Sequence, residues 1–118
     1  MCTLYRLDSS RTNVADLFGA VDRAGNVPGG EIYPQYPRLV VVERQGVRLL
    51  EGMTWGWPLA LKGKPGQPLK PRPVNNARTD KLMTPFWKSA ATKPAQRCLI
   101  PVNAFAEAVG ERGRMTRT

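Results

Sequence analysis

Frequent prolines and glycines are the feature that most restricts how this chain can fold. Eleven of its 118 residues are proline and another eleven are glycine, and both residue types interrupt helices. The apolar runs between them are short, and those rich in β-branched residues favour strands. We therefore predict one α+β domain over residues 1–118, with short helices and a mostly antiparallel, curled, barrel-like sheet.

The apolar pattern predicts where these elements lie. Thr12 or Asn13 is expected to cap a helix that runs to about Ala20, and a second, short helix is expected over residues 85–91. Residues 62–73 form a basic, Pro/Gly-rich loop, and loops of this length in compact domains are usually functional or mobile. Strands are predicted over residues 3–7, 38–43, 47–50 (after a turn at Gly46), 53–57, 98–102 and 104–109.

The last residues indicate that the domain continues beyond them. Residues 111–118 resemble a hairpin turn that leads into a new strand, where the sequence stops. An edge strand that ends in mid-pattern is a liability for a folded domain. We therefore expect the chain to be a C-terminally truncated form of a larger domain, either as a fragment or as a naturally short form.

Positive charge is concentrated in the second half of the chain. Residues 1–61 carry six basic and six acidic side chains, whereas residues 62–118 carry twelve basic and three acidic ones, which accounts for the whole net charge of +9. A basic field of this kind attracts polyanions and accelerates their association. We favour contact with nucleic acid, and the alternative is a solvated surface that only maintains solubility.

Cysteine and histidine usage limits the possible chemistry. The chain has two cysteines and no histidine, which excludes His-based catalysis within it and argues against a zinc site, so we expect no metal and no cofactor. Two cysteines make no disulfide framework, and Cys98 in an apolar run is predicted to be a buried thiol. No apolar run approaches the roughly 18 residues that span a bilayer and no signal peptide is recognised, so we expect a cytoplasmic protein without a membrane partner.

Several short motifs occur in a consistent order along the chain. Met1-Cys2 opens it, Trp55-Gly56 lies within residues 53–57, and Asn76-Ala77-Arg78 is followed by Asp80. A longer block, RCLIPVNAFAE, covers residues 97–107, and YPQYP covers residues 33–37. Each piece alone is weak, but the ordered set resembles the SRAP family (SOS response-associated peptidase) over nearly the whole chain, which corresponds to about the first half of the usual domain.

The resemblance implies a specific covalent chemistry. Members of this family remove Met1 and use the exposed cysteine to cross-link the ring-opened aldehyde of abasic sites in single-stranded DNA. The resemblance therefore implies a role in the DNA damage response. The expected partner is single-stranded DNA, and the protein is expected to be a monomer that associates with the nucleoid when it binds DNA. The implied catalytic residues are Cys2, Asn76 and Glu107, and Arg78 is implied to contact the DNA backbone. Charge adds Arg72 and Lys70 as expected phosphate contacts, and Trp55, through its motif, and Pro37 are expected to offer apolar faces for bases.

Elementary chemistry suits these residues to those roles. An N-terminal cysteine carries an amine and a thiol on adjacent carbons, so an imine formed by the amine can close into a five-membered thiazolidine. The apolar neighbours of Glu107 are expected to raise the pKa of its carboxyl, which suits it to proton transfer. Each residue also has a purely structural alternative. Cys2 could be an ordinary thiol at a frayed terminus, and Glu107 could be a surface carboxylate. Trp55 and Trp57 could both pack in the core, because alternation along a strand would place them on the same face.

The chain also departs from the family pattern. The family uses a downstream histidine, which these residues lack, and its usual Cys-Gly-Arg opening is Cys2-Thr3-Leu4 here. Two alternatives therefore stay open. One is a cysteine peptidase or autoprocessing hydrolase that uses Cys2, and the other is a non-catalytic basic module that binds single strands with a strong salt dependence.

Overall fold

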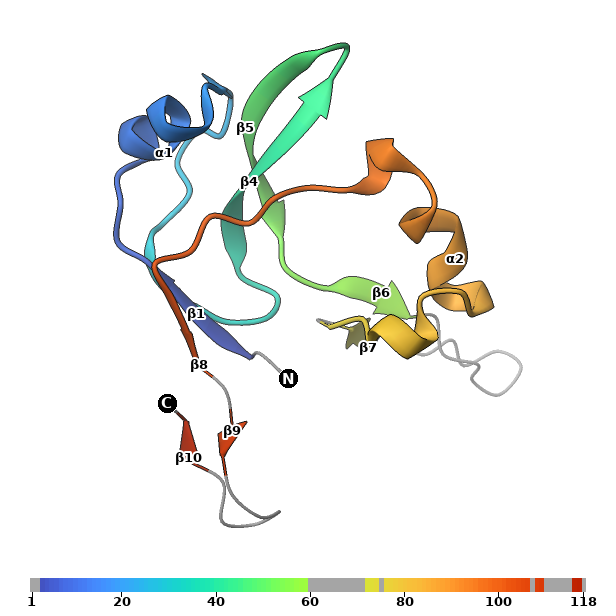
Figure 1. Cartoon of the computed structure of the whole chain (residues 1–118). Helices are drawn as coiled ribbons and strands as arrows, with labels where there is room; N and C mark the ends of the chain where they lie inside the picture. The colour runs from blue at the N-terminus through green and yellow to red at the C-terminus, as the bar shows by residue number, and fades with distance from the viewer. Residues whose placement is uncertain (1–2, 60–71, 75, 107, 110–115, 118) are drawn as a thin grey trace, which may run out of the picture.

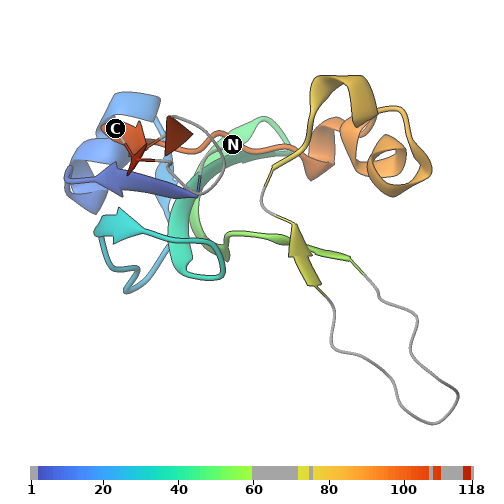
Figure 2. The same cartoon turned by 90° about the horizontal axis from the view of Figure 1, so that it is seen from below.

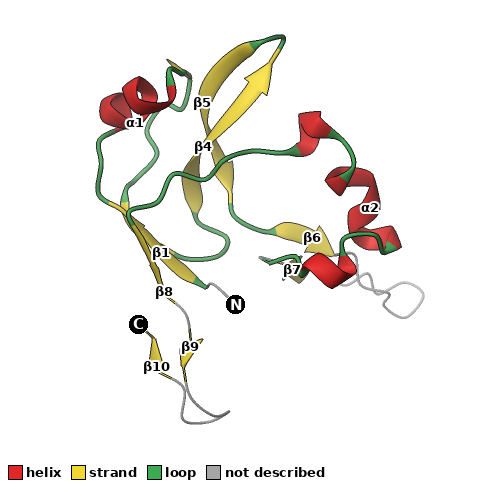
Figure 3. Ribbon diagram, viewed as in Figure 1, coloured by secondary structure: helices red, strands yellow, loops and turns green. Residues whose placement is uncertain are grey.

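The fold is an assembly of small sheets with two short helices (Figures 1 and 3). The computed structural model describes residues 3–59, 72–74, 76–106, 108–109 and 116–117. Within this part of the chain the strands form two three-stranded and two two-stranded sheets, and every strand pair is antiparallel except β2–β5. The predicted α+β class is confirmed, whereas no closed barrel is formed by the described strands.

The longest element is the hairpin of β4 (Pro37–Arg44) and β5 (Val47–Thr54). Its two-residue turn consists of Gln45 and Gly46 at φ angles of 52° and 75°, a left-handed pair that matches the twist of the flanking strands and favours glycine. The register runs from Arg44 opposite Val47 to Pro37 opposite Thr54. The predicted hairpin is confirmed, but β5 continues to Thr54, so the separate strand predicted over residues 53–57 is wrong.

A second sheet packs against this hairpin. Its order is β3 (Gly30–Ile32), β1 (Leu4–Leu7) and β8 (Ala104–Ala106). Tyr5 lies opposite both Ile32 and Phe105, so these three side chains lie on one face of the sheet. Tyr5 and Ile32 are buried there, whereas Phe105 at the edge is 63% exposed.

Helix α1 (Arg11–Phe18) closes one end of the core. Ser10, not the predicted Thr12 or Asn13, is its N-cap, and the Ser10 hydroxyl accepts a 3.1 Å hydrogen bond from the Asn13 backbone N–H. The helix buries Val14 and Ala15. The chain then enters β2 (Val21–Asp22), which runs parallel to β5.

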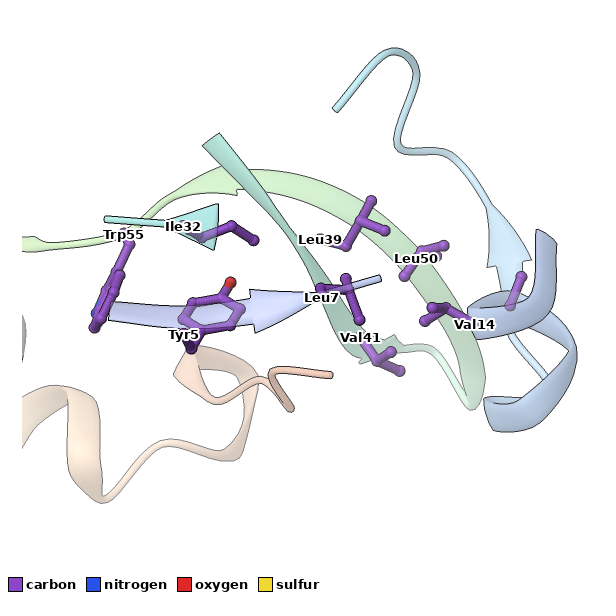
Figure 4. Close-up of a cluster of buried hydrophobic side chains, with 9 residues drawn as sticks. Tyr5, Leu7, Val14, Ile32, Leu39, Val41, Leu50 and Trp55 are labelled. Carbon is purple, nitrogen blue, oxygen red and sulfur yellow. The ribbon is translucent and has the colours of Figure 1, made fainter. Parts of the chain in front are cut away.

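The core lies between the two three-stranded sheets and α1 (Figure 4). Ile32 and Leu50 are its most completely buried large side chains, and Val40 is equally buried outside this cluster. Alternation along β4 sends Leu39 and Val41 into this core and Val40 and Val42 to the opposite face. The segment that follows α2 runs along the edge of β4 that does not pair with β5, where Val41 and Leu99 exchange two backbone hydrogen bonds of 2.9 Å.

The second half of the chain lies mostly to one side of this core (Figures 1 and 2). The predicted helix over residues 85–91 is confirmed as α2. The predicted strand over residues 98–102 is wrong, because only Leu99 of this segment forms a β-bridge. The loop predicted over residues 62–73 is too long at its end, because Arg72 and Pro73 belong to a strand. The remaining elements are β6 (Trp57–Leu59), β7 (Arg72–Val74), η1 (Thr79–Lys81), α2 (Pro85–Ala91), η2 (Pro94–Gln96), β9 (Ala108–Val109) and β10 (Thr116–Arg117).

The C-terminal pairing agrees with the sequence pattern. Thr116 and Arg117 pair antiparallel with Val109 and Ala108, as expected for a hairpin followed by a new strand. None of the helices in the described ranges has the length and apolarity needed to cross a membrane.

Candidate functional site

Two adjoining pockets mark the candidate site, where the β4–β5 hairpin meets the second half of the chain. The larger has a volume of about 330 Å³. Its walls come from Arg38 of β4, the end of β5, the start of β6, α2, and Val74, Asn76, Ala77, Gln96, Cys98 and Ile100. The smaller has a volume of about 250 Å³ and extends over the face of the β1–β8 pair. The residues that line both pockets are Arg38, Trp55, Asn76 and Ile100.

Trp55 forms the buried wall between the pockets. Only 6% of it is exposed, its ring meets that of Tyr5 edge to face at 5.3 Å between centroids, and the Arg38 Cζ atom lies 5.4 Å from its ring centroid. Its backbone N–H donates to the Tyr36 carbonyl and its carbonyl accepts from the Gln35 N–H, at 3.1 and 2.7 Å. Trp55 is therefore a core residue whose ring lines the site.

Gly56 lies between Trp55 and Trp57 and explains why these two tryptophans have different environments. Its φ of 135° lies in a region that residues with a Cβ atom rarely adopt. The chain therefore turns between Trp55 and Trp57 instead of continuing as an extended strand. Trp57 is 37% exposed, so the expectation that alternation would place both tryptophans on one face is wrong.

An aromatic row borders the larger pocket. The rings of Trp57 and Trp87 lie 6.0 Å apart with a tilt of 52°, and the rings of Phe86 and Trp87 meet edge to face at 4.6 Å. Trp87 lines the pocket from α2. Sequence reasoning missed Phe86 and Trp87, although adjacent aromatics beside the helix-starting Pro85 in the basic half of the chain were a usable signal.

The three residues of the Asn-Ala-Arg motif have different surroundings. Asn76 lines both pockets and Ala77 lines the larger one. Arg78 is exposed at the start of η1, where its Nη2 atom pairs with Asp80 Oδ2 at 2.9 Å. Exposed pairs of this kind are weak and are readily exchanged for other anions, so Arg78 is accessible to a polyanion.

The other predicted site residues have less direct positions. Pro37 is exposed at the start of β4, next to Tyr36, whose carbonyl accepts from Trp55. The backbone of Arg72 pairs with that of Leu59 in the β6–β7 ladder, and its side chain is outside the described part. Cys2, Glu107 and Lys70 also lie outside the described residues.

Arg38 is a site residue that sequence reasoning missed. It is only 8% exposed and lines both pockets. Its Nε and Nη1 atoms have no hydrogen-bond partner among the described residues. The arginine at the start of the β-branched run RLVVVE was a usable signal, because a charged side chain in a buried strand is costly unless a partner satisfies its charge.

The described second half of the chain, which forms part of the pocket walls, carries several exposed cations. Arg78, Lys81, Lys88, Lys93 and Arg97 are exposed, and Asp80 is the only acidic residue among described residues 72–106. The larger pocket and the smaller pocket have no acidic side chain among their described lining residues. This arrangement favours an anionic ligand.

Other observations limit the chemistry of the described part. No group of three or more His, Cys, Asp or Glu side chains suited to a metal ion occurs there. Cys98 is exposed and lines the larger pocket, so the prediction of a buried thiol is wrong. A hydrogen bond and the negative charge of Glu51 raise the pKa of Arg44 above its usual value, but this pair lies near the hairpin turn, away from the pockets.

Comparisons with known proteins agree with this geometry. The family model for SOS response associated peptidase (SRAP) matches residues 1–116. The crystal structure of a structural-genomics target protein from Bordetella bronchiseptica is similar in fold, with a TM-score of 0.68 and 21% sequence identity. The match covers 98% of this chain and 55% of that one, so this chain spans about half the length of its structural relative. No match is found among curated proteins.

Proposed function

Because this chain belongs to the SRAP family, we propose that it captures abasic sites in single-stranded DNA covalently, with Cys2 as the nucleophile. Residues 1–118 would form the N-terminal part of one such domain, acting in the DNA damage response. The observation that carries the proposal is the pair of adjoining pockets that share Trp55 and Asn76, in a chain whose second half carries exposed cations. A cytoplasmic location close to DNA follows from this role.

The reaction begins at the N-terminal amine that removal of Met1 exposes. An α-amine has a pKa of roughly 7.7–8.0, so a useful fraction is unprotonated at neutral pH. Its nitrogen attacks the aldehyde carbon of the ring-opened abasic sugar to give a carbinolamine, which loses its hydroxyl group as water and becomes an imine. The Cys2 sulfur then adds to the imine carbon and its proton passes to the nitrogen. The product is a thiazolidine, and the reaction needs no oxidant or reductant.

Chain connectivity supports a shared location for Cys2 and Glu107. Leu4 lies opposite Ala106 at the end of the β1–β8 ladder. Cys2 is two residues before Leu4, Glu107 directly follows Ala106, and a chain advances at most about 3.6 Å per residue. Leu4 and Ala106, the residues of this ladder nearest to Cys2 and Glu107, thus lie at the end of the ladder whose Tyr5 and Phe105 line the smaller pocket.

Asn76 and Glu107 have complementary roles in this proposal. The Asn76 amide can hold the terminal amine or a sugar hydroxyl without adding charge, and Asn76 lines both pockets. Glu107 would carry protons to and from the sugar oxygen and the carbinolamine, a task that a positioned carboxyl performs. These two residues thus supply orientation and proton transfer around the nucleophile.

Strand binding would use the cations and the aromatic row. Arg78, together with Lys70 and Arg72, would contact phosphates, and the partly exposed Trp57 with Trp87 offers apolar surface for bases. A basic surface with stacking aromatics is how proteins hold single strands without reading their sequence. The burial of Trp55 makes it a wall of the site, while Pro37 would contact the strand at the pocket rim.

A denaturing gel tests the proposal. The chain is incubated with single-stranded DNA that holds one abasic site, alongside Cys2→Ala and Cys98→Ala variants. We expect a shifted band for the parent chain and for Cys98→Ala, and none for Cys2→Ala. Salt-sensitive binding without any shifted band would instead indicate a non-catalytic DNA-binding module. Peptide turnover that depends on Cys2, again without a shifted band, would indicate a peptidase.

A further inference from the structure

Arg38 is the only buried polar or charged side chain in the described part of the chain. It belongs to β4, opposite Met53 of β5, and alternation places it on the strand face that also carries Val40 and Val42. Both valines are buried, and Glu51, which lies opposite Val40 in β5, is paired with Arg44. The Arg38 guanidinium reaches the Trp55 ring between the two pockets, with 5.4 Å from Cζ to the ring centroid.

Within the described part of the chain, the Arg38 guanidinium lacks the partners that its burial requires. Its Nε and Nη1 atoms are buried and have no hydrogen-bond partner, and Arg38 takes part in none of the ion pairs found among the described residues. A buried cation is costly unless an anion or several acceptors satisfy it. The cation–π contact with the Trp55 ring offsets only part of this free-energy cost.

The two pockets give an external anion access to Arg38. Both are lined by Arg38, and neither has an acidic residue among its described lining. A guanidinium presents a planar fork of N–H donors that matches the oxygens of a phosphate or carboxylate. Because Asn76 and Trp55 line the same two pockets, an anion at Arg38 lies in the space that the proposed substrate would enter.

We propose that Arg38 is a phosphate-binding residue that takes the phosphate next to the abasic sugar and so positions the aldehyde for Cys2. This inference rests on the proposed function for the identity of the substrate. The site would bind the phosphate of a small sugar phosphate as well as that of a DNA strand, since the guanidinium recognises the group and not the polymer.

Two small sugars, one with and one without a phosphate, separate the proposed phosphate binding by Arg38 from the reaction of Cys2. The chain without Met1 (residues 2–118) is incubated with 2-deoxyribose or with 2-deoxyribose 5-phosphate, and adduct formation is followed by intact mass. We expect the phosphorylated sugar to react roughly 10- to 100-fold faster at low concentration, which is the range that hydrogen bonds to a charged group supply. Equal rates for the two sugars in the parent chain would overturn the proposal without requiring any variant.

Three variants locate the phosphate preference. Arg38→Gln should reduce the rate ratio of the phosphorylated to the unphosphorylated sugar to about one. Arg38→Lys keeps the charge but loses the fork, so it should retain only part of the preference. Arg23→Gln removes one exposed positive charge outside both pockets and should leave the ratio intact. A full ratio in folded Arg38→Gln, with folding verified by circular dichroism, would overturn the proposal.

A binding measurement keeps the test independent of the covalent reaction. Inorganic phosphate is titrated while the indole N–H resonance of Trp55 is followed by NMR. We expect a saturable shift in the parent chain and in Arg23→Gln, but not in Arg38→Gln. Failure of both sugars to react would refute the proposed function alone, whereas the absence of a saturable shift in the parent chain would refute the role of Arg38.

Discussion

Replacing Trp55 and Trp57 one at a time tests the distinction between the core and the DNA-binding surface. Trp55 is 6% exposed and contacts Tyr5 and Arg38, whereas Trp57 is 37% exposed and contacts Trp87. Replacing a buried large aromatic with alanine typically costs about 3–5 kcal/mol of unfolding free energy. For Trp57→Ala, a lost aromatic pair of about 0.5–1.5 kcal/mol and a smaller loss of burial give an expected cost of about 1–2 kcal/mol.

Urea denaturation followed by far-UV circular dichroism measures both costs. A domain of this size has a total stability of only about 5–15 kcal/mol, so Trp55→Ala is expected to lower the midpoint strongly. Trp55→Phe retains an aromatic ring and should give an intermediate, measurable loss of about 1–2 kcal/mol. Equal losses for Trp55→Ala and Trp57→Ala would refute the assignment of Trp55 to the core.

DNA binding should show the opposite order for the two tryptophans. Stacking of one base on an aromatic side chain contributes about 1–3 kcal/mol, so Trp57→Ala should weaken binding of single-stranded DNA roughly 5- to 150-fold. Trp55→Phe should bind with an affinity close to that of the parent chain. Fluorescence anisotropy with an undamaged labelled strand measures both affinities. Unchanged binding in Trp57→Ala would remove the aromatic row from the DNA-binding surface.

Three further changes test the fold and the charge distribution. Ser10→Ala removes the N-cap of α1 and should lower stability by about 1 kcal/mol, whereas Thr12→Ala, inside the helix, should change it by less than about half of that. Leu50→Ala should cost about 2–5 kcal/mol, because Leu50 is fully buried in the core; a loss below about 1 kcal/mol in urea denaturation would contradict its place there. The affinity for single-stranded DNA should fall linearly with rising salt on a double logarithmic plot, with a slope of about −0.7 for each phosphate contacted. Arg78→Gln should reduce that slope by about one phosphate contact, and an unchanged slope would show that Arg78 does not contact the strand.

Local sequence patterns predicted the elements that depend on local interactions. The β-branched run at residues 38–43 and the turn at Gly46 predicted the hairpin, and the apolar spacing with Pro85 predicted α2. The helix near residues 11–18 was also predicted, but with the wrong cap, because Ser, Thr and Asn side chains are all suited to that position. These elements form where propensity and turn chemistry agree.

Tertiary packing decided the features that the sequence did not predict. The extension of β5 to Thr54 depends on Pro37 lying opposite it, and the segment at residues 98–102 is not a strand because only Leu99 reaches β4. Cys98 is exposed although its neighbours in the sequence are apolar. Hydrophobic runs do not reveal which partner surface is available, so these outcomes could not be read from the pattern.

The candidate site was predictable in its residue types but not in its arrangement. The Trp-Gly and Asn-Ala-Arg motifs indicated Trp55 and Asn76, which line the same two pockets. The burial of Arg38 beside Trp55 depends on strand alternation and on the turn at Gly56. Both are properties of the folded chain, and they bring together residues that are 17 positions or more apart in the sequence.

The most direct test of the central claim is to identify the atom that carries the DNA adduct. The cross-linked species is prepared without a reducing agent, digested, and analysed by mass spectrometry. We predict an adduct on the N-terminal peptide that begins at Cys2, with the mass of peptide plus abasic DNA remnant less one water, as a thiazolidine requires. An adduct on a lysine, or an unmodified N-terminal peptide that retains Met1 within the cross-linked protein, would contradict the account.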